Sequence, residues 1–237
     1  MLAYSRDSHL CEPGKTGMLR WNILRLWAFM SRFRPRFERH RLDTPELLAS
    51  FLCTRSSYVA QTSLYGYLKT RMGTSYRTYF EDDMFSASIR MAAIKLFLSC
   101  LADLTVFAAA LCARDGPLPP SGAAALAQFC FQRAATQGLA EAGVGPVPVD
   151  ALERLTQRLQ ATDWEAAVDG RRAFAGSEVD LVRFAPVIDE YKALDREIVT
   201  NSIRFRWHDV RDQLRRRLEA PRLANKIPPQ AVDTTDG

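Results

Sequence analysis

A run of twenty consecutive residues, 94–113, restricts the fold more than any other feature of the sequence. The run reads IKLFLSCLADLTVFAAALCA, and its two charged residues are Lys95 near the start and Asp103 in the middle. An apolar helix of this length could cross a bilayer, but a charge near the bilayer centre costs at least roughly 2.5 to 3.5 kcal/mol. We therefore predict a helix that is buried in a protein core and enclosed by other helices.

Asp103 then needs a partner, because an isolated buried carboxylate is too costly to keep its charge. In an antiparallel hairpin of two long helices that turns near residue 76, the region opposite Asp103 contains Arg55 and Tyr58. We expect the Arg55 guanidinium or the Tyr58 hydroxyl to hold the carboxylate. Together with Gln61, these residues form a predicted polar core cluster that is either structural or holds a ligand.

The rest of the chain also predicts helices, because sustained alternation of apolar and polar residues and hairpin turns are nearly absent. We expect an all-α fold, an irregular helical bundle with a long antiparallel helix hairpin and a long basic C-terminal helix. The second predicted helix is capped by Asp43 or Thr44, has Pro45 in its first turn and ends at Gly73. The predicted helices span residues 18–33, 45–72, 80–113, 123–142, 149–160 and 186–219, with a shorter piece around 164–174.

The domain organisation follows from the segments that interrupt these helices. We expect one helical domain, residues 18–219, with a candidate internal boundary in the proline- and glycine-rich segment 115–122. Residues 1–17 lack the apolar centre of a secretory signal and are predicted to be a flexible arm. Residues 220–237 have the composition of a disordered tail.

The cysteines indicate a reducing compartment. The chain has five of them, with no C-x-x-C pair and no interleaved histidines, which argues against a disulfide framework and against a zinc site. Cys53, Cys100 and Cys130 lie in apolar helical segments and are predicted to be small buried hydrophobic residues. We expect a cytoplasmic protein that can also attach peripherally to the inner membrane.

Motifs for catalysis and for cofactor binding are missing. The sequence has no G-x-S-x-G nucleophile elbow, no glycine-rich phosphate-binding pattern, and no paired Glu-x-x-His of the kind that di-iron bundles use. We therefore expect no metal and no cofactor. A partner has to be sought in the distribution of charge and aromatic residues instead.

The strongest charge cluster lies at residues 18–41. Seven arginines stand there against one acidic residue, Glu38, and they alternate with tryptophan and phenylalanine. Such a segment is typical of a helix at an anionic membrane surface or against an acidic protein partner. The other interpretation is an amphipathic helix that buries its tryptophans in the core of the protein itself.

The last predicted helix repeats this pattern with a clearer period. One apolar stripe, which should face the bundle, consists of Val199, Ile203, Trp207, Val210, Leu214 and Leu218. Arginines occupy the opposite face, where they are either solvated or bind phosphate groups. The predicted anion-binding residues of both segments are Arg20, Arg25, Arg32, Arg34, Arg36, Arg39, Arg204, Arg211, Arg215 and Arg216.

Two stretches, SSYVAQTSLYGYLKTRMGT at residues 56–74 and DREIVTNSIRFRWHDVR at residues 195–211, resemble a bacterial family of largely uncharacterised helical proteins loosely labelled "esterase". The likeness covers residues 44–111 and 186–218. The label implies ester hydrolysis, and the family provides no catalytic residues to carry over. If hydrolysis occurs, the residue types leave one plausible set, which is Ser56, Ser57 or Ser63 with His208 and Asp103.

We expect a non-catalytic helical interaction or scaffold protein that associates through basic amphipathic helices with an anionic membrane surface or a membrane-bound protein complex. An esterase-type hydrolase on a non-standard helical scaffold is the alternative, with Ser57, His208 and Asp103 as its candidate residues. A nucleic-acid-associated protein ranks third, because no recognition module is visible and a net charge of +5 over 237 residues is modest. The sequence also leaves room for a homo-oligomer.

Overall fold

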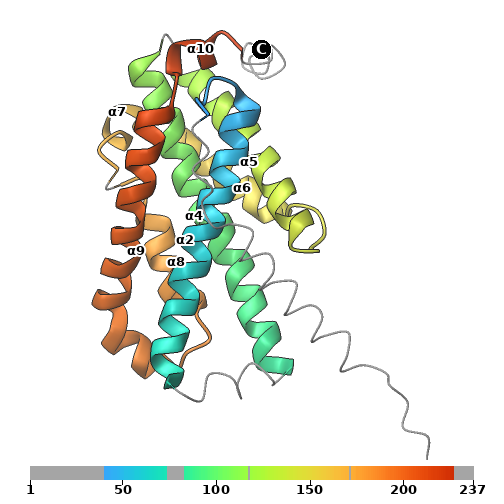
Figure 1. Ribbon diagram of the computed structural model, residues 1–237, viewed down its shortest axis with the longest axis vertical. Helices are drawn as coiled ribbons and strands as arrows, with labels where there is room; N and C mark the ends of the chain where they lie inside the picture. Colours follow the sequence, from blue (N-terminus) through green and yellow to red (C-terminus); the bar gives the residue numbers. More distant parts are fainter. Residues whose placement is uncertain (1–39, 74–82, 117, 171, 227–237) are drawn as a thin grey trace, which may run out of the picture.

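The computed structural model describes residues 40–73, 83–116, 118–170 and 172–226, and these residues form a bundle of helices (Figure 1). Apart from one isolated bridge between Leu42 and Leu218, they contain no strand pairing. The prediction of an all-α bundle is confirmed. The helices are α2 (Pro45–Met72), α4 (Asp83–Asp115), α5 (Pro120–Glu141), α6 (Val149–Gln160), α7 (Trp164–Ala167), α8 (Ala175–Phe184), α9 (Asp189–Arg217) and α10 (Ala220–Ala224).

Helix α2 has the bounds that its capping residues predict. The Thr44 hydroxyl accepts a hydrogen bond from the Leu47 N–H at 3.2 Å, and Pro45 occupies the first turn. At the other end Gly73 has a positive φ of 55°, which glycine adopts without steric cost, and its N–H donates to the Lys69 carbonyl. Helix α4 runs back antiparallel to α2, so the predicted long helix hairpin is present (Figure 1).

Helix α4 is the central helix of the bundle. By length and composition it could cross a membrane, but 83% of its most apolar eighteen-residue window is buried. Helices α2, α5 and α8 all pack against it. Only residues 116–119 separate α4 from α5 in the sequence, and these two helices lie against each other and against α2.

The C-terminal half departs from prediction in two places. Helix α8 was not predicted, and only the first part of the expected piece at 164–174 is helical, as α7. The prediction of disorder is wrong for residues 220–224, which form α10 with Leu223 fully buried. Local composition suggested a tail, whereas backbone hydrogen bonds from Leu42 to Arg217 and from Glu219 to Leu42 hold this segment on the bundle.

Several predictions concern residues outside the described part of the chain. They are the arm at 1–17, the helix at 18–33, the end of the tail at 227–237, and the candidate anion-binding residues Arg20, Arg25, Arg32, Arg34, Arg36 and Arg39. The apolar stripe of α9 is described, and its residues from Val199 to Leu214 are buried as predicted.

The cysteines within the described residues are all buried and free: Cys53, Cys100, Cys112 and Cys130. Burial raises the pKa of Cys53 and of Cys112 to about 12, and it raises the pKa of Cys100 and Cys130 well above the ordinary thiol value. Because the thiolate is the reactive form, these side chains should behave as small apolar core residues.

We expect a Cys11→Ser variant to react only very slowly with an aromatic disulfide reagent while it is folded. In guanidinium chloride the same variant should release the chromophore of four thiols, because unfolding exposes them and restores their ordinary pKa. Absorbance readings at intervals give both rates. Rapid labelling of even one thiol in the folded protein would contradict the burial described here.

Candidate functional site

An ion pair between a fully buried carboxylate and a partly exposed arginine lies at the centre of the bundle. Asp103 on α4 is fully buried, and its Oδ1 accepts a hydrogen bond from Nη1 of Arg158 on α6 at 2.6 Å. Its Oδ2 accepts from the backbone N–H of Ser177 on α8 at 2.7 Å. Arg158 also donates to the Ala173 carbonyl at 2.5 Å. One carboxylate therefore joins three helices.

The same network extends to α9 through Ser177. The Ser177 hydroxyl donates to the Phe174 carbonyl at 3.3 Å and accepts from Nε1 of Trp207 at 3.0 Å. The Trp207 ring lies 4.5 Å from the Phe174 ring, measured between centroids, and Phe174 lies 5.3 Å from Phe107 of α4. Polar and aromatic contacts around Ser177 and Phe174 thus hold α8 and α9 against α4.

The electrostatics of Asp103 reflect two opposing causes. Burial raises the pKa of Asp103 above its ordinary value, and the Arg158 charge and the bonds from Ser177 act against that rise. Helix α8 can approach so closely because Gly176 has no side chain: a Cβ there would lie 2.8 Å from Oδ1 of Asp103. With donors on both oxygens, Asp103 can anchor the bundle without an added ligand.

The prediction that Arg55 or Tyr58 would hold Asp103 is wrong. Phe97 of α4 faces α2 and α5, where a Cβ on Gly138 would come within 2.5 Å of its ring. Asp103 follows Phe97 by six residues, which places it about 120° away around the helix axis. It therefore faces α6 and α8, and the hairpin register alone could not reveal this rotation.

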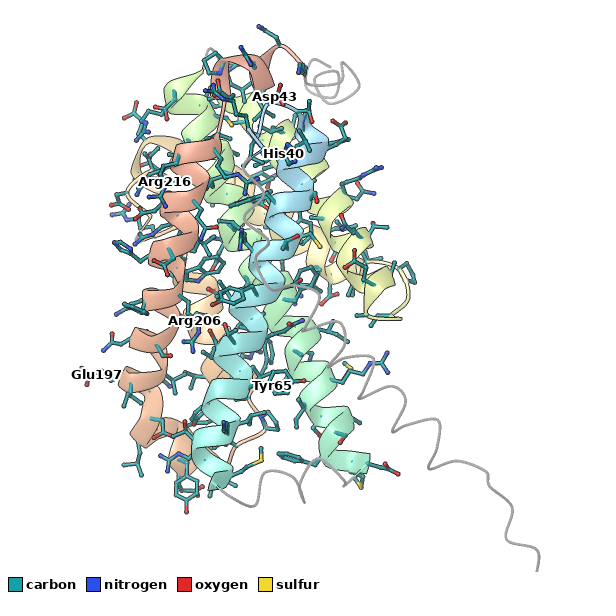
Figure 2. All side chains as sticks on the ribbon, in the orientation of Figure 1. His40, Asp43, Tyr65, Glu197, Arg206 and Arg216 are labelled. Carbon is teal, nitrogen blue, oxygen red and sulfur yellow. The ribbon has the colours of Figure 1, made fainter. Side chains whose placement is uncertain are left out.

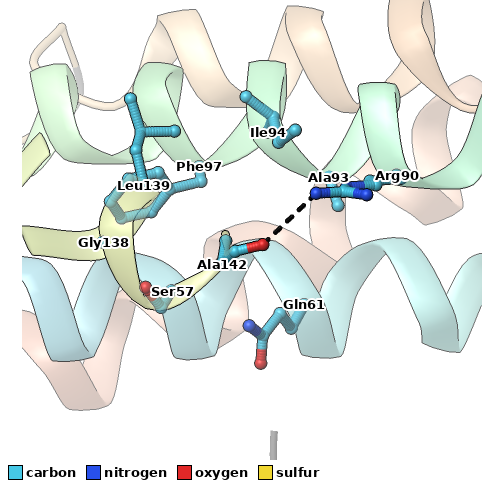
Figure 3. A pocket seen from close by; sticks show the side chains of 9 residues that line it. All are labelled: Ser57, Gln61, Arg90, Ala93, Ile94, Phe97, Gly138, Leu139 and Ala142. Atoms are coloured by element: carbon cyan, nitrogen blue, oxygen red, sulfur yellow. Dashed lines mark hydrogen bonds between the residues drawn. The ribbon is translucent and has the colours of Figure 1, made fainter. Parts of the chain in front are cut away.

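Other members of the predicted polar core cluster have different surroundings. Arg55 lies with its guanidinium carbon 5.5 Å from the centroid of the Phe51 ring. Gln61 and Ser57 line a small cavity between α2, α4 and the end of α5 (Figure 3). Arg90 also lines this cavity, and it donates hydrogen bonds to the carbonyls of Ala142 and Gly143, just after α5, at 3.4 Å and 3.2 Å.

The cavity beside Ser57 is too small for an ester substrate. Its volume of about 40 Å³ matches roughly one or two water molecules. His208 lies elsewhere, with a side chain that is 66% exposed and an Nδ1 atom 3.6 Å from Asp212. Among the described residues no hydrogen bond joins Ser57, His208 and Asp103. The structure does not bring the hydrolytic set together.

Two candidate serines remain. Ser56 is fully buried, and Ser63 lies in a groove of about 450 Å³ between α2 and α9. Residues of α2 and of α9 form opposite sides of this groove, where Arg71 pairs with Asp195. Arg206 points from α9 toward α2 (Figure 2). Burial and the nearby Asp195 raise the pKa of Tyr67, which also lines the groove, to about 12.

Most of the predicted anion-binding arginines of α9 contact groups of the bundle. Arg216 is exposed to solvent. The pKa of Arg211 is lowered by burial and by the neighbouring charge of Arg215. These side chains lie partly across α7 and α8, so they are a weaker anion-binding face than the sequence suggests. The contacts are Arg204 with the Glu178 carboxylate, Arg211 with the Phe174 ring and Arg215 with the Phe107 ring.

A larger groove of about 590 Å³ lies between α4, α6 and α8, and we call it the α4–α6–α8 groove. Apolar side chains line much of it, among them Ile94, Leu98, Phe131, Leu155 and Phe184. Its charged side chains are Lys95, Arg154, Arg158 and Arg183 with the acids Asp150 and Asp180. The groove therefore combines apolar side chains with an excess of positive charge.

Two of the groove cations contact an aromatic ring. The Lys95 Nζ atom lies 4.9 Å from the centroid of Phe184, and the Arg183 guanidinium carbon lies 5.3 Å from it. Arg154 pairs with Asp150 at 3.0 Å, although both side chains are about two-thirds exposed. In the described part of the chain, Lys95 and Arg183 form no ion pair, so their charges can reach an anion outside the protein.

Sequence reasoning missed Arg158, Ser177 and the groove cations. One signal was available, because Arg154 and Arg158 stand four residues apart on a helix that was predicted with its correct bounds, which places both on one face. Ser177 could not have been found, since it contributes its backbone N–H and lies in a helix that was not predicted.

Within the described residues, no group of three or more His, Cys, Asp or Glu side chains is placed to hold a metal ion. Comparison with protein-family models, with curated proteins and with solved structures finds no match to the chain.

Proposed function

We propose that the protein is a non-catalytic helical interaction protein that binds anionic phospholipid membranes through the α4–α6–α8 groove. The observation that carries this proposal is the combination of an apolar lining with Lys95, Arg154 and Arg183, which are all exposed at the groove. A protein that lies on a membrane needs both components, because buried apolar area supplies adhesion and cations attract the anionic headgroups.

Exposed apolar side chains next to the groove support the proposal. Met91, which lines the groove, is 54% exposed, and Val149, beside Pro148 and Asp150 of the groove, is 69% exposed. Such side chains can insert at the boundary between headgroups and acyl chains. The separate surroundings of His208 and Asp103 support the non-catalytic part of the proposal, since each has partners outside the candidate hydrolytic set.

Charge reversal at the groove should abolish vesicle binding. We expect the wild-type protein to co-sediment with vesicles of phosphatidylcholine and phosphatidylserine at low salt, and to dissociate as salt is added. The triple variant Lys95→Glu, Arg154→Glu, Arg183→Glu should bind at least about 100-fold more weakly, at roughly 1 kcal/mol for each cation. Circular dichroism checks that this variant keeps its helices.

A matched control has the same change in net charge at exposed positions on α2, α5 and α10: Lys69→Glu, Arg133→Glu and Arg222→Glu. It should keep most of the vesicle binding. Equal losses in the two triple variants would mean that only net charge matters. A wild-type protein that does not bind phosphatidylserine vesicles at low salt would rule the proposal out. A chain that starts at His40 measures the contribution of the basic residues 18–39 separately.

A further inference from the structure

Helix α9 carries large apolar side chains on two sides. One side packs into the bundle through Val199 to Leu214. The other side is largely exposed, although apolar residues in such a row are usually covered. Its members are Tyr191, Leu194, Ile198 and Phe205, which are 45%, 77%, 71% and 76% exposed. On this side the Tyr191 ring contacts the Arg71 guanidinium of α2, and Ile198 lies at the rim of the groove between α2 and α9. Helix α9 lies at the edge of the bundle, and Glu197 projects outward from it (Figures 1 and 2).

The exposed side has the spacing of a coiled-coil seam. Its positions repeat at intervals of three and four residues, which is the spacing that keeps one seam facing a partner helix over several turns. The apolar members fill the first half, and polar residues fill most of the second. The complete seam is Tyr191, Leu194, Ile198, Asn201, Phe205, His208 and Asp212.

The row of charges beside this seam is complementary to itself. Glu190, Glu197, Arg204 and Arg211 follow one another at intervals of seven residues, with the acids first and the arginines last. In an antiparallel helix pair this flanking row meets the same row of the other helix in reverse order. Glu197 would then lie opposite Arg204 of the partner subunit. The Arg211 side chain is partly buried against Gly170 and the Phe174 ring of its own subunit, so the complementarity rests on Glu197 and Arg204.

We propose that α9 forms the interface of a two-fold symmetric dimer, in which it packs antiparallel to α9 of a second copy of the chain. A surface that complements itself when reversed is what a two-fold interface requires, whereas a different partner would need no such relation. A parallel pair would place Glu190 against Asp195 of the partner subunit, so charge favours the antiparallel arrangement. The residues that line the α4–α6–α8 groove are all on other elements, so this inference stands apart from lipid binding.

The seam defines the register of the dimer. With the two-fold axis near residues 199 and 200, Leu194 packs on Phe205 of the partner subunit, and Tyr191 lies opposite His208 of the partner subunit. Asn201 is a polar residue within the seam, and a single residue of this kind commonly sets register. Arg204 uses Nε and Nη2 for Glu178, while its Nη1 lies 3.5 Å from Asn201 Oδ1, on the side of the seam.

Sedimentation equilibrium of the full chain tests the interface. We expect a dimer for the wild type, and a self-association at least about 100-fold weaker for the double variant Ile198→Lys, Phe205→Lys. Both side chains are more than two-thirds exposed in one subunit, so the variant should keep its helical content. The control Met84→Lys, Val149→Lys changes two equally exposed apolar residues outside α9 and should remain dimeric.

Disulfide cross-linking tests the orientation. In a Cys11→Ser background, the combination Leu194→Cys with Phe205→Cys should form a covalent dimer on mild oxidation, and each single variant should not. Equal positions lie apart in the antiparallel register, by about 16 Å for residue 194 at 1.5 Å per residue. Efficient cross-linking of a single variant would indicate a parallel pair. That outcome, or a wild type that is monomeric at every concentration, overturns the proposal.

Discussion

Replacing Asp103 by alanine should lower the free energy of unfolding by about 3 kcal/mol. This is the lower end of the cost of breaking a buried ion pair from one side, because the Arg158 side chain is 27% exposed and keeps contact with water. The change leaves the Arg158 guanidinium and the Ser177 N–H without their acceptor, in a place where the carboxylate itself is fully buried. For a chain of this size the melting temperature should fall by roughly 2 to 4 °C per kcal/mol. Denaturant titration followed by circular dichroism measures the loss.

Two controls separate the ion pair from general damage. Asp150→Ala removes one partner of the exposed pair with Arg154 and should cost less than about 1 kcal/mol. The double variant Asp103→Ala, Arg158→Ala should lose less than the sum of its two single variants, because the second change removes the charge that the first one strands. An Asp103→Ala protein with unchanged stability would show that the network at the centre of the bundle contributes nothing.

Replacing Trp207 by alanine should have an effect of similar size, about 3 to 5 kcal/mol, since it empties the space of a large and almost fully buried side chain. Trp207 joins α9 to α8 through its bond to Ser177 and its contact with the Phe174 ring. Hydrogen exchange should therefore show lost protection in α9 before it appears in the α2–α4 hairpin. Chemical denaturation gives the total loss of stability.

Two further tryptophan variants serve as controls for Trp207→Ala. Trp207→Phe keeps an aromatic ring but loses the indole N–H. It should lower the free energy of unfolding less than the alanine variant does, with about 1 kcal/mol of the loss due to the missing hydrogen bond. Trp164→Ala removes a half-buried tryptophan from α7 and should also cost less. Equal losses for the Trp164 and Trp207 alanine variants would contradict the role of Trp207 as the contact that holds α9.

Prediction from sequence worked best where the signal is local. Helix α2 matches its prediction because Thr44, Pro45 and Gly73 act within one turn of each helix end. Helix α8 was missed because its ten residues carry no side-chain cap at the N-terminus. The position of α8 depends on Asp103 of α4, whose carboxylate accepts a hydrogen bond from the Ser177 N–H near the start of α8.

The candidate site was predictable only in part. A buried aspartate in an apolar helix announces a need for a partner, and the structure supplies one in Arg158. The identity of that partner depends on how α4 is rotated about its own axis, and sequence spacing does not define this rotation. The cations of the α4–α6–α8 groove come from three helices, so no single stretch of sequence could group Lys95, Arg154 and Arg183.

The sequence by itself determined that this protein is a bundle of helices around one apolar helix, since caps, prolines and apolar periodicity act over a few residues. It also determined that Asp103 needs a partner, because the apolar residues on either side of it predict a buried helix and an unpaired buried charge is costly. Only the tertiary structure decided which side chains meet: Arg158 and Ser177 at Asp103, Trp207 at Phe174, and the cations at the groove. The physical reason is that such contacts depend on helix rotation and packing between segments far apart in the chain, which local preferences do not specify.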